Sequence, residues 1–434
     1  MFSEIKRQLK PSKGTEEKIK GIKEEIIQRL KEEGYKATPA GSTARGTYLP
    51  EKPDIDIFFY FSPDTKREKL EKEGIKIGKK ILKNNKPTTH YAEHPYVKAE
   101  VKGIDIDLVP CYEVKEYKDN KEELKIEGEL LSAVDRTPLH NQYLKENIKD
   151  EQKIEVKLLK KFLKNIGCYG ADEKTRGFSG YTTELLILKY NTFEETLKAA
   201  SKWKRNQEID IEKHGEKEFK DPLVIIDPID PKRNAAAAIS EETLGRFIVK
   251  SRKLLKNPTK EQFKSKIKIN REKIKEKNLI LIEMPYPEET VPETAWSQLR
   301  KLEKQVTKKL SQDEFKVYRS AHWTDENTKT QILLEIRNKE LPKYRRHMGP
   351  PFYNKEHSKR FMEKEENQEI HIQGERLYAL KKRKHRKIKE KIKSILKSEE
   401  IPSRYQKPVK KTEVTEGIEK IIEQKGILKR YLQI

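Results

Sequence analysis

Apolar side chains recur every three or four residues between positions 19 and 30. This spacing predicts an amphipathic helix. A Gly-Ser turn at Gly41 and Ser42 comes next, followed by stretches whose patterns predict a strand, a charged helix and two further strands, at 55–61, 66–83, 96–101 and 104–109. The order of helix, turn and strands indicates an α+β domain that ends near residue 140.

The pattern becomes helical between residues 151 and 200, with a glycine-rich break at 167–180. A short apolar run at 223–226 predicts a buried strand that ends in an Asp-Pro turn. A lysine-rich helical stretch at 250–277 precedes a predicted strand at 279–283, a helix at 294–310, strands at 314–320 and 331–336, and a last helix at 382–397. We therefore expect an α+β protein with more than one domain.

The chain is strongly basic, with 96 Lys and Arg against 72 Asp and Glu in 434 residues, a net charge of +24. This surplus predicts a polyanionic partner, most often nucleic acid. The alternative is a compositional bias of the kind found in some heat-adapted organisms. Because no apolar run approaches the roughly 18 residues that cross a bilayer, we expect a cytoplasmic protein with no membrane partner. Cys111 and Cys168 lack the spacing of a zinc site or disulfide framework and are expected to be buried.

Two predicted strands carry paired carboxylates. Side chains alternate between the faces of a strand, so Asp54 and Asp56 share one face about 6–7 Å apart while Ile55 lies on the other. A second strand repeats the pattern with Asp105 and Asp107. Carboxylates held this close repel one another unless a cation joins them. If the two strands are neighbours, they offer enough carboxylates for two Mg²⁺ ions.

The Gly-Ser turn upstream supplies a complementary chemistry. A glycine lets the backbone approach a phosphate closely, Ser42 offers a hydroxyl and an amide, and Arg45 offers a positive charge. An Asp-x-Asp strand by itself is most often an exposed strand face. The turn before it and the second Asp-x-Asp after it favour a site for metal ions and substrate phosphates.

A Gly-Ser pair, eleven intervening residues and Asp54-Ile55-Asp56 resemble the signature of the DNA polymerase β nucleotidyltransferase superfamily. The longer string from Gly41 to Leu49 resembles the archaeal, class I CCA-adding enzymes, which are tRNA nucleotidyltransferases of that superfamily. The likeness continues through further blocks at 107–112, 132–140, 169–171, 176–181 and 227–234, with a shorter echo at 347–351. This ordered set is far more specific than the Asp-x-Asp pair.

The resemblance implies a fold in three parts. These are a polymerase β-like catalytic head at 1–142, a helical neck at 143–257, and an RRM-like α/β body with a tail at 258–434. The body lacks the aromatic-rich RNP signature, so we do not expect bases to stack on its sheet. The tail region carries a basic run at 381–387, which we expect to begin a helix and to contact phosphates along the acceptor and T stems of tRNA.

The resemblance also implies a site. It gives two Mg²⁺ ions to Asp54, Asp56 and Asp107, the triphosphate to Ser42, Arg45, Lys160 and Tyr169, a nucleotide contact to His140, and recognition of the incoming base to Arg233. The family often has Glu at the position of Asp54. Asp105 has no metal role in the family, and we interpret it as a peripheral carboxylate.

Several of these residues could have a structural role instead of a role in ligand binding. Lys160 could lie on a solvated helix face, and Tyr169 and Tyr181 could be core aromatics. His140 could cap a helix or be a surface residue. Arg233 could pair with Asp227 or Asp230. Of the two tyrosines, only Tyr169 is expected to act on a ligand, because it sits in the glycine-rich break.

The function implied is template-independent addition of C, C and A to the 3′ end of tRNA, from CTP and ATP, with release of pyrophosphate. Family likeness also suggests a homodimer. Two alternatives stay open: another RNA-tailing nucleotidyltransferase, such as a poly(A) polymerase or an oligoadenylate synthetase-like enzyme, and a tRNA-binding protein without catalysis.

Overall fold

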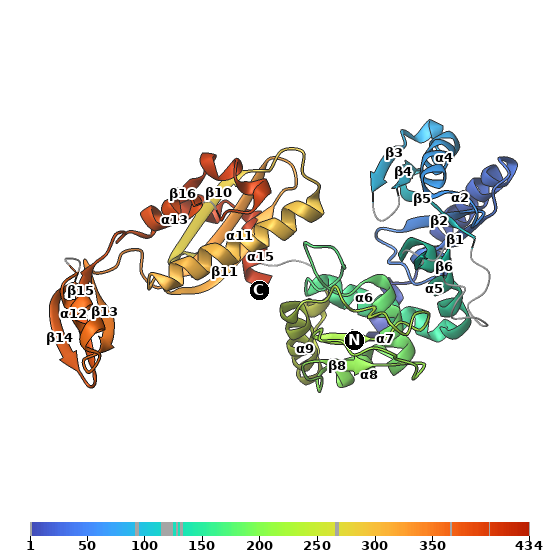
Figure 1. Ribbon diagram of the computed structural model, residues 1–434. Coiled ribbons are helices and arrows are strands. Elements are labelled where there is room, and N and C mark those ends of the chain that lie inside the picture. The colour runs from blue at the N-terminus through green and yellow to red at the C-terminus, as the bar shows by residue number, and fades with distance from the viewer. Residues whose placement is uncertain are drawn as a thin grey trace. The chain divides into compact units, whose positions relative to one another are not determined.

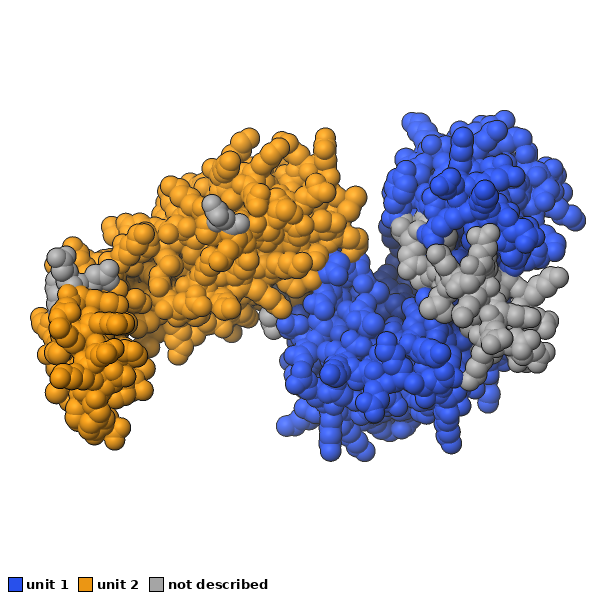
Figure 2. Space-filling model, in the orientation of Figure 1, with its two compact units in different colours: residues 1–265 blue, residues 266–434 orange. Residues whose placement is uncertain are grey.

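The computed structural model describes residues 2–91, 95–113, 125–126, 129–130, 133–264, 269–364, 367–398 and 400–433. Two compact units make up the chain, Met1–Ser265 and Lys266–Ile434, coloured blue and orange in Figure 2. The predicted boundary between neck and body, at 257/258, lies close to the division between the units. The predicted boundary at 142 falls inside helix α5 (Ala133–Asn147), within unit 1. The three-part division stays a prediction.

The first part of unit 1 is a five-stranded sheet covered by two helices (Figure 1). Its strands lie in the order β1 (Ala37–Ala40), β2 (Asp54–Phe61), β5 (Ile104–Tyr112), β4 (Pro95–Val101) and β3 (Thr88–Tyr91). Only β2 and β5 run parallel. Helices α2 (Lys13–Glu32) and α4 (Arg67–Ile81) pack on the sheet and bury the predicted apolar stripe, including Ile19, Ile26 and Leu30. The predictions of these strands and helices are confirmed.

Helices build the rest of unit 1. They are α1 (Phe2–Gln8), α5, α6 (Asp150–Asn165), α7 (Gly180–Tyr190), α8 (Phe193–Ala200) and α9 (Glu241–Lys256), with a two-stranded parallel pair of β8 (Gln207–Ile209) and β9 (Leu223–Ile225). Phe162, Phe178, Phe193 and Phe247 lie at the centre of their shared core. Ser179 ends the glycine-rich break by accepting a hydrogen bond from the Thr182 amide, which starts α7. This cap fixes where the side chains of α7 point.

Unit 2 contains two antiparallel sheets. The larger has the order β11 (Val317–Thr324), β12 (Lys329–Ile336), β10 (Leu279–Pro285) and β16 (Glu413–Thr415), and helix α11 (Pro292–Gln312) packs on it. The smaller has the order β13 (Tyr344–Pro351), β15 (Arg376–Lys382) and β14 (Asn367–Gln373), with α12 (Lys355–Met362) against it. The sequence patterns did not predict this smaller sheet.

Two predicted helices are wrong in their extent. The stretch 250–277 is not one helix, because α9 already begins at Glu241, capped by Ser240, and α10 (Arg271–Lys275) is separate. The helix predicted at 382–397 begins only at Ile388 (α13, Ile388–Leu396), because residues up to Lys382 pair in β15. It is also not the last helix, since α14 (Ile418–Ile422) and α15 (Lys425–Gln433) follow.

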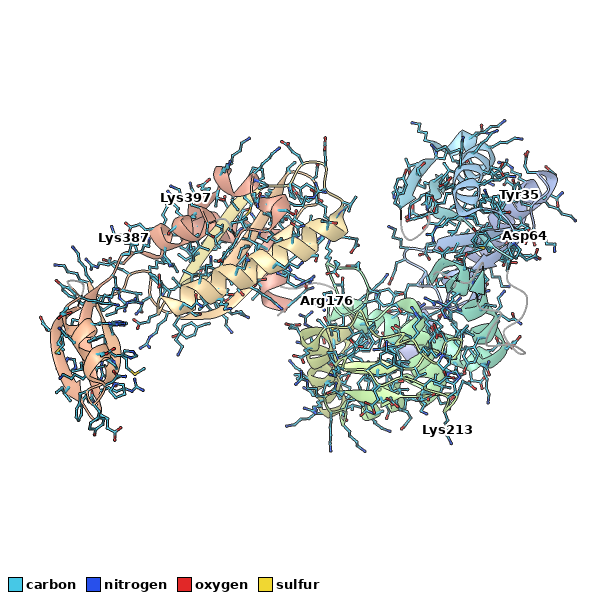
Figure 3. The ribbon with its side chains drawn as sticks, in the orientation of Figure 1. Tyr35, Asp64, Arg176, Lys213, Lys387 and Lys397 are labelled. Carbon is cyan, nitrogen blue, oxygen red and sulfur yellow. The ribbon has the colours of Figure 1, made fainter. Side chains whose placement is uncertain are left out.

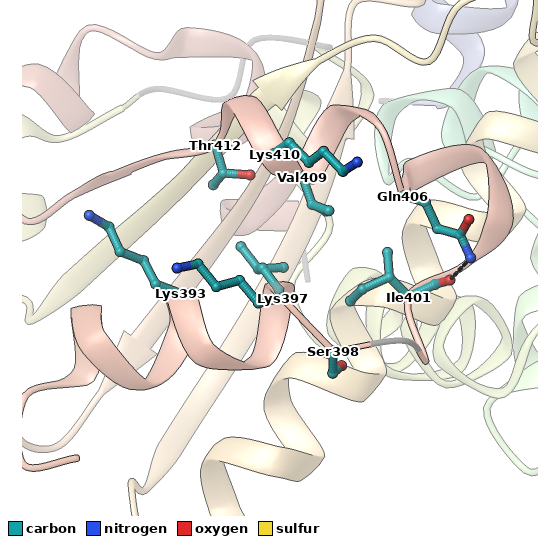
Figure 4. Close-up of a pocket in the computed structure, with 9 residues that line it drawn as sticks. Lys393, Lys397, Ser398, Ile401, Gln406, Val409, Lys410 and Thr412 are labelled. Carbon is teal, nitrogen blue, oxygen red and sulfur yellow. Dashed lines mark hydrogen bonds between the residues drawn. The ribbon is translucent and has the colours of Figure 1, made fainter. Parts of the chain in front are cut away.

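The structure also bears on the compositional predictions. Cys111 and Cys168 are both free and buried, as expected. Within the described ranges, no helix combines the length and the apolar character that a membrane span requires. Unit 2 holds a cavity beside α13 that is lined by Lys393, Leu396, Lys397, Ser398, Ile401, Gln406, Val409, Lys410 and Thr412 (Figure 4). None of the predicted site residues lines it.

Candidate active site

The two Asp-x-Asp strands are neighbours in the head sheet. In the parallel pairing of β2 with β5, Asp56 lies opposite Asp107 and Asp54 lies opposite Asp105. Ile55, on the other face of β2, is fully buried in the core under the sheet. The alternation of the sequence therefore places four carboxylates along one face of two adjacent strands.

Burial and mutual repulsion shift the titration of this cluster. Burial, together with the charges of Asp54 and Asp107, raises the pKa of Asp56 to about 7. Burial also raises the pKa of Asp107, against the opposing effect of Lys98. The Lys98 Nζ lies 3.3 Å from Asp107 Oδ1 and 3.8 Å from Asp105 Oδ2. This pattern is that of acidic groups brought together for a cation.

The carboxylates fit a divalent cation. Asp107 Oδ1 is buried and accepts no hydrogen bond, although Lys98 is close to it. Among the described residues, no three His, Cys, Asp or Glu side chains already converge on one point tightly enough to hold an ion. A hard cation such as Mg²⁺ commonly takes one or two carboxylates and completes its shell with substrate phosphates and water. The pair Asp56 and Asp107, with Asp54 beside them, suits that mode.

The Gly-Ser turn forms the first turn of the short helix α3 (Gly41–Arg45) and contacts the carboxylates directly. Gly41 has φ +67°, and a Cβ at this position would overlap Asp56 Oδ2. The Ser42 hydroxyl donates to Asp54 Oδ1 at 3.3 Å. After α3, Gly46 adopts a left-handed conformation with φ +72° and turns the chain so that Thr47 is buried.

Arg45, Thr47 and Lys160 meet around one carboxylate that the sequence patterns did not single out, Glu184 on α7. Arg45 donates to both Glu184 oxygens, from Nε at 3.2 Å and from Nη2 at 2.8 Å. The Thr47 hydroxyl donates to Glu184 as well. Lys160 Nζ lies 3.7 Å from Glu184 and donates to the Thr47 carbonyl at 3.2 Å. Lys160 is thus not on a solvated helix face, because its side chain is almost fully buried.

Tyr169 lies beside this group. A Cβ on Gly180 would stand 3.3 Å from the Tyr169 hydroxyl and 3.7 Å from Lys160 Nζ, so both polar ends face the start of α7. Burial, with the nearby charges of Glu184 and Asp54, raises the pKa of Tyr169 well above its ordinary value. The phenol therefore stays protonated and can donate a hydrogen bond.

His140 and Arg233 meet at a second buried carboxylate, Asp227. His140 Nε2 lies 2.9 Å from Asp227 Oδ2, and the Tyr181 hydroxyl donates to Asp227 Oδ1 at 2.9 Å. Arg233 donates to the same carboxylate. The rings of His140 and Tyr181 stack with centroids 4.2 Å apart. Hydrogen bonds and charge from His140, and the charge of Arg233, hold the pKa of Asp227 well below its usual range despite burial.

The structure thus gathers the nine predicted residues into three contact groups. Asp54, Asp56, Asp107 and Ser42 form the first, Arg45, Lys160 and Tyr169 the second, and His140 and Arg233 the third. The alternative that Arg233 pairs with Asp227 is observed, whereas Asp230 pairs with Arg136. The sequence patterns missed Glu184. One signal could have indicated it: Glu184 is the only acidic residue of the apolar helix α7.

Comparison with known families follows the same order along the chain. Residues 19–131 match the model of the nucleotidyltransferase domain. Residues 154–264 match that of the second domain of tRNA nucleotidyltransferase, and residues 276–412 that of the C-terminal domain of CCA-adding enzymes. The CCA-adding enzyme of Methanococcus maripaludis strain C7 is 36% identical over 408 residues, which cover 89% of each chain. That of Methanocaldococcus jannaschii is 35% identical over 418 residues, covering 91% of this chain and 90% of its own.

The chain belongs to the CCA-adding enzyme family. This membership confirms the family resemblance that the motifs indicated. It also confirms the prediction that the chain is a multidomain α+β nucleotidyltransferase. In this CCA-adding enzyme family member, the carboxylate face of β2 and β5 belongs to the segment that matches the nucleotidyltransferase domain. Lys160, Glu184 and Asp227 belong to the segment that matches the second domain. Family membership also implies dependence on a divalent metal ion.

Proposed function

We propose that this protein adds C, C and A to the 3′ end of tRNA without a nucleic-acid template, using CTP and ATP and releasing pyrophosphate. The observation that carries the proposal is the match to CCA-adding enzymes along nearly the whole chain. The pairing of Asp56 with Asp107 in adjacent parallel strands supports it, because phosphoryl transfer of this class needs neighbouring carboxylates.

We propose Mg²⁺ as the metal and Asp54, Asp56 and Asp107 as its ligands. When bound, Mg²⁺ would lower the pKa of the tRNA 3′-hydroxyl and neutralise charge on the phosphates. Asp107 accepts the proton of that hydroxyl, since its Oδ1 is buried and accepts no hydrogen bond. Ser42 and Arg45 hold the triphosphate from the head, and Lys160 and Tyr169 hold it from α6 and the loop that follows.

The base of the incoming nucleotide would meet the group around Asp227. Arg233 presents a guanidinium whose position is fixed by Asp227, and a guanidinium can bond in a planar, directional way to a base edge. His140, stacked on Tyr181, adds a second polar contact. Both residues contact one carboxylate, that of Asp227, and this supports a common role in binding the nucleoside end.

The decisive experiment uses tRNA that lacks its CCA end, incubated with labelled CTP and ATP. We expect two CMP additions followed by one AMP and then a stop. An open-ended A tail would instead identify a poly(A) polymerase-like enzyme, and tRNA binding without any addition would identify a non-catalytic protein.

A matched pair of variants tests the carboxylates. Asp107→Ala should abolish addition, whereas Asp105→Ala, on the same face of β5 but paired with Lys52 and Lys98, should leave it largely intact. Wild-type activity in Asp107→Ala would overturn the metal assignment. Chelation followed by addition of Mg²⁺ or Ca²⁺ tests the identity of the ion, because only Mg²⁺ favours the compact octahedral shell.

Two further parts of the proposal concern the protein's setting. We propose that it works as a homodimer, which light scattering of the purified protein tests directly; a single-chain mass near 51.2 kDa would contradict it. We also propose that it acts in the cytoplasm, where its tRNA substrates are found, and fractionation of cells that express a tagged chain tests that location.

A further inference from the structure

Glu184 is a charged residue of the site whose side chain, on α7, is fully buried. Its partners come from three other segments of unit 1: Arg45 at the end of α3, Thr47 just after it, and Lys160 on α6. The pairing with Arg45 uses both carboxylate oxygens, the geometry that fixes a guanidinium most firmly. The Glu184 side chain exposes no surface to solvent.

The charges around Glu184 do not balance. One carboxylate faces two cations, Arg45 and Lys160, whose side chains are both largely buried. Burial lowers the pKa of Lys160, and Glu184 opposes that shift. Because two cations share one anion, the group retains a net positive charge beside Ser42 and Asp54.

The contacts of Arg45 do not use all of its hydrogen-bond donors. Arg45 Nη1 donates to Asn141 Oδ1 at 2.8 Å, so each terminal nitrogen of the guanidinium has one N–H committed and a second N–H that these contacts do not use. The Asn141 amide in turn donates to the Pro39 carbonyl of β1 at 3.3 Å. The guanidinium is therefore held from both sides by residues that are themselves anchored.

We propose that Glu184 is a positioning residue for the triphosphate. It holds Arg45 and Lys160 together as one preformed cationic group and fastens α3 of the head to α6 and α7. The inference deepens the proposed function and depends on it for the identity of the ligand. In this inference Glu184 acts only on the binding of the phosphate chain. Its substitution should therefore affect CTP and ATP equally, whichever base the nucleotide carries.

The test compares Glu184→Gln with the wild-type chain in binding CTP, ATP and tripolyphosphate by calorimetry in the presence of Mg²⁺. Gln keeps the volume but removes the charge that holds two cations. We expect all three ligands to bind about tenfold or more weakly, by a shared factor, since charge-assisted contacts of this kind are lost together. In steady-state assays, KM for CTP and ATP should rise in parallel.

Three further variants distinguish a loss of phosphate positioning from simple misfolding. Thr47→Val removes the hydroxyl between Glu184 and Lys160 without changing any charge, and should give the same pattern with a smaller loss, whereas Thr47→Ser should restore affinity. Glu195→Gln, at an exposed position of α8, should bind like the wild type. Thermal unfolding of each variant, measured alongside, identifies a variant that has lost its fold.

Three results would overturn the inference. These are wild-type tripolyphosphate affinity in Glu184→Gln, a loss confined to CTP or to ATP, and wild-type affinity in Thr47→Val if Glu184→Gln does not fold. The proposed function fails differently, through the absence of CCA addition by the wild-type chain, so the two failures cannot be confused.

Discussion

Two constraints require glycine at position 41: the backbone conformation and the lack of space for a side chain. Its φ of +67° disfavours any residue with a Cβ, and the space a Cβ would occupy is taken by Asp56 Oδ2. The glycine thus does more than turn the chain, because it lets the backbone rest against a carboxylate of the proposed metal site. A phosphate contact by the α3 backbone would use the same lack of a side chain.

Gly41→Ala should therefore reduce CCA addition by at least about tenfold, because Asp56 must move away from Asp107. Gly34→Ala is the matched control, since Gly34 has φ +84° but nothing within 4 Å of the added Cβ. That variant should lose about 1 kcal/mol of unfolding free energy and keep its activity. Initial rates and denaturant unfolding of both variants decide the matter, and equal activities would contradict a role for the close approach.

Asp227 organises the other end of the site by accepting from His140, Tyr181 and Arg233. Asp227→Asn keeps the shape but removes the charge that holds Arg233. We expect it to change the ratio of kcat/KM for CTP and ATP while affecting tripolyphosphate binding little. An unchanged ratio would argue against a base-recognition role for this group. The variant thus contrasts with Glu184→Gln.

The same variant should lower stability in a pH-dependent way. The pKa of Asp227 is held below its ordinary value of 3.8, so its ionised form stabilises the folded state at neutral pH. That contribution is complete above the ordinary value and is lost as the pH falls toward the depressed one. Asp227→Asn should cost about 1–3 kcal/mol at pH 7, and the difference should shrink in unfolding experiments below pH 3.8.

At the level of elements, periodicity identifies single strands and helices well but does not pair them. Alternating Asp and Ile predicted β2 and β5 separately, and only the observed register shows that Asp56 lies beside Asp107 and not beside Asp105. Glu184 shows the same limit. Its helix was predicted, but two of its partners, Thr47 and Arg45, lie 137 and 139 residues away along the chain, where no local pattern can indicate them.

The basic run at 381–387 contains side chains with two different environments in the folded chain: some make internal contacts and others are exposed to solvent. It was expected to begin a helix, but it ends β15 and forms the connection to α13, with Lys387 as the residue before that helix (Figure 3). Arg383 turns inward, donating to Glu314 and to the Asp313 carbonyl, and Arg386 donates to the Leu341 carbonyl. Lys382, Lys384 and Lys387 are exposed.

Exchange of these three lysines for Gln should weaken tRNA binding without lowering the unfolding temperature. The slope of log affinity against log salt should fall by about one for each phosphate contact removed. Arg383→Gln should do the opposite, costing about 1 kcal/mol of stability through its lost internal contacts while leaving the salt slope nearly unchanged. Filter binding over a salt series and thermal melts separate the two effects, and an unchanged slope in the triple variant would exclude this loop from the RNA interface.

Across the whole molecule, the positive charge is unevenly distributed between the two units. Residues 266–434 contain 42 Lys and Arg against 26 Asp and Glu, a net charge of +16, whereas the longer unit 1 contains 54 against 46, a net charge of +8. A uniform compositional bias would have given the larger unit the larger surplus. The excess therefore belongs mainly to unit 2, which also carries the exposed lysines beside the cavity of Figure 4, whereas the carboxylates of β2 and β5 belong to unit 1.

This division predicts different salt dependences for the two ligands of one protein. A tRNA that contacts the basic surface of unit 2 releases many counterions, so its affinity should fall steeply between 50 and 200 mM salt, by about 10³-fold or more if six or more phosphates are contacted. CTP meets few cations, and the two around Glu184 are largely buried and hence weakly screened, so its affinity should fall much less. Calorimetry for CTP and filter binding for tRNA over the same salt series give both slopes. Equal slopes would mean that the charge of unit 2 reflects composition and not RNA binding.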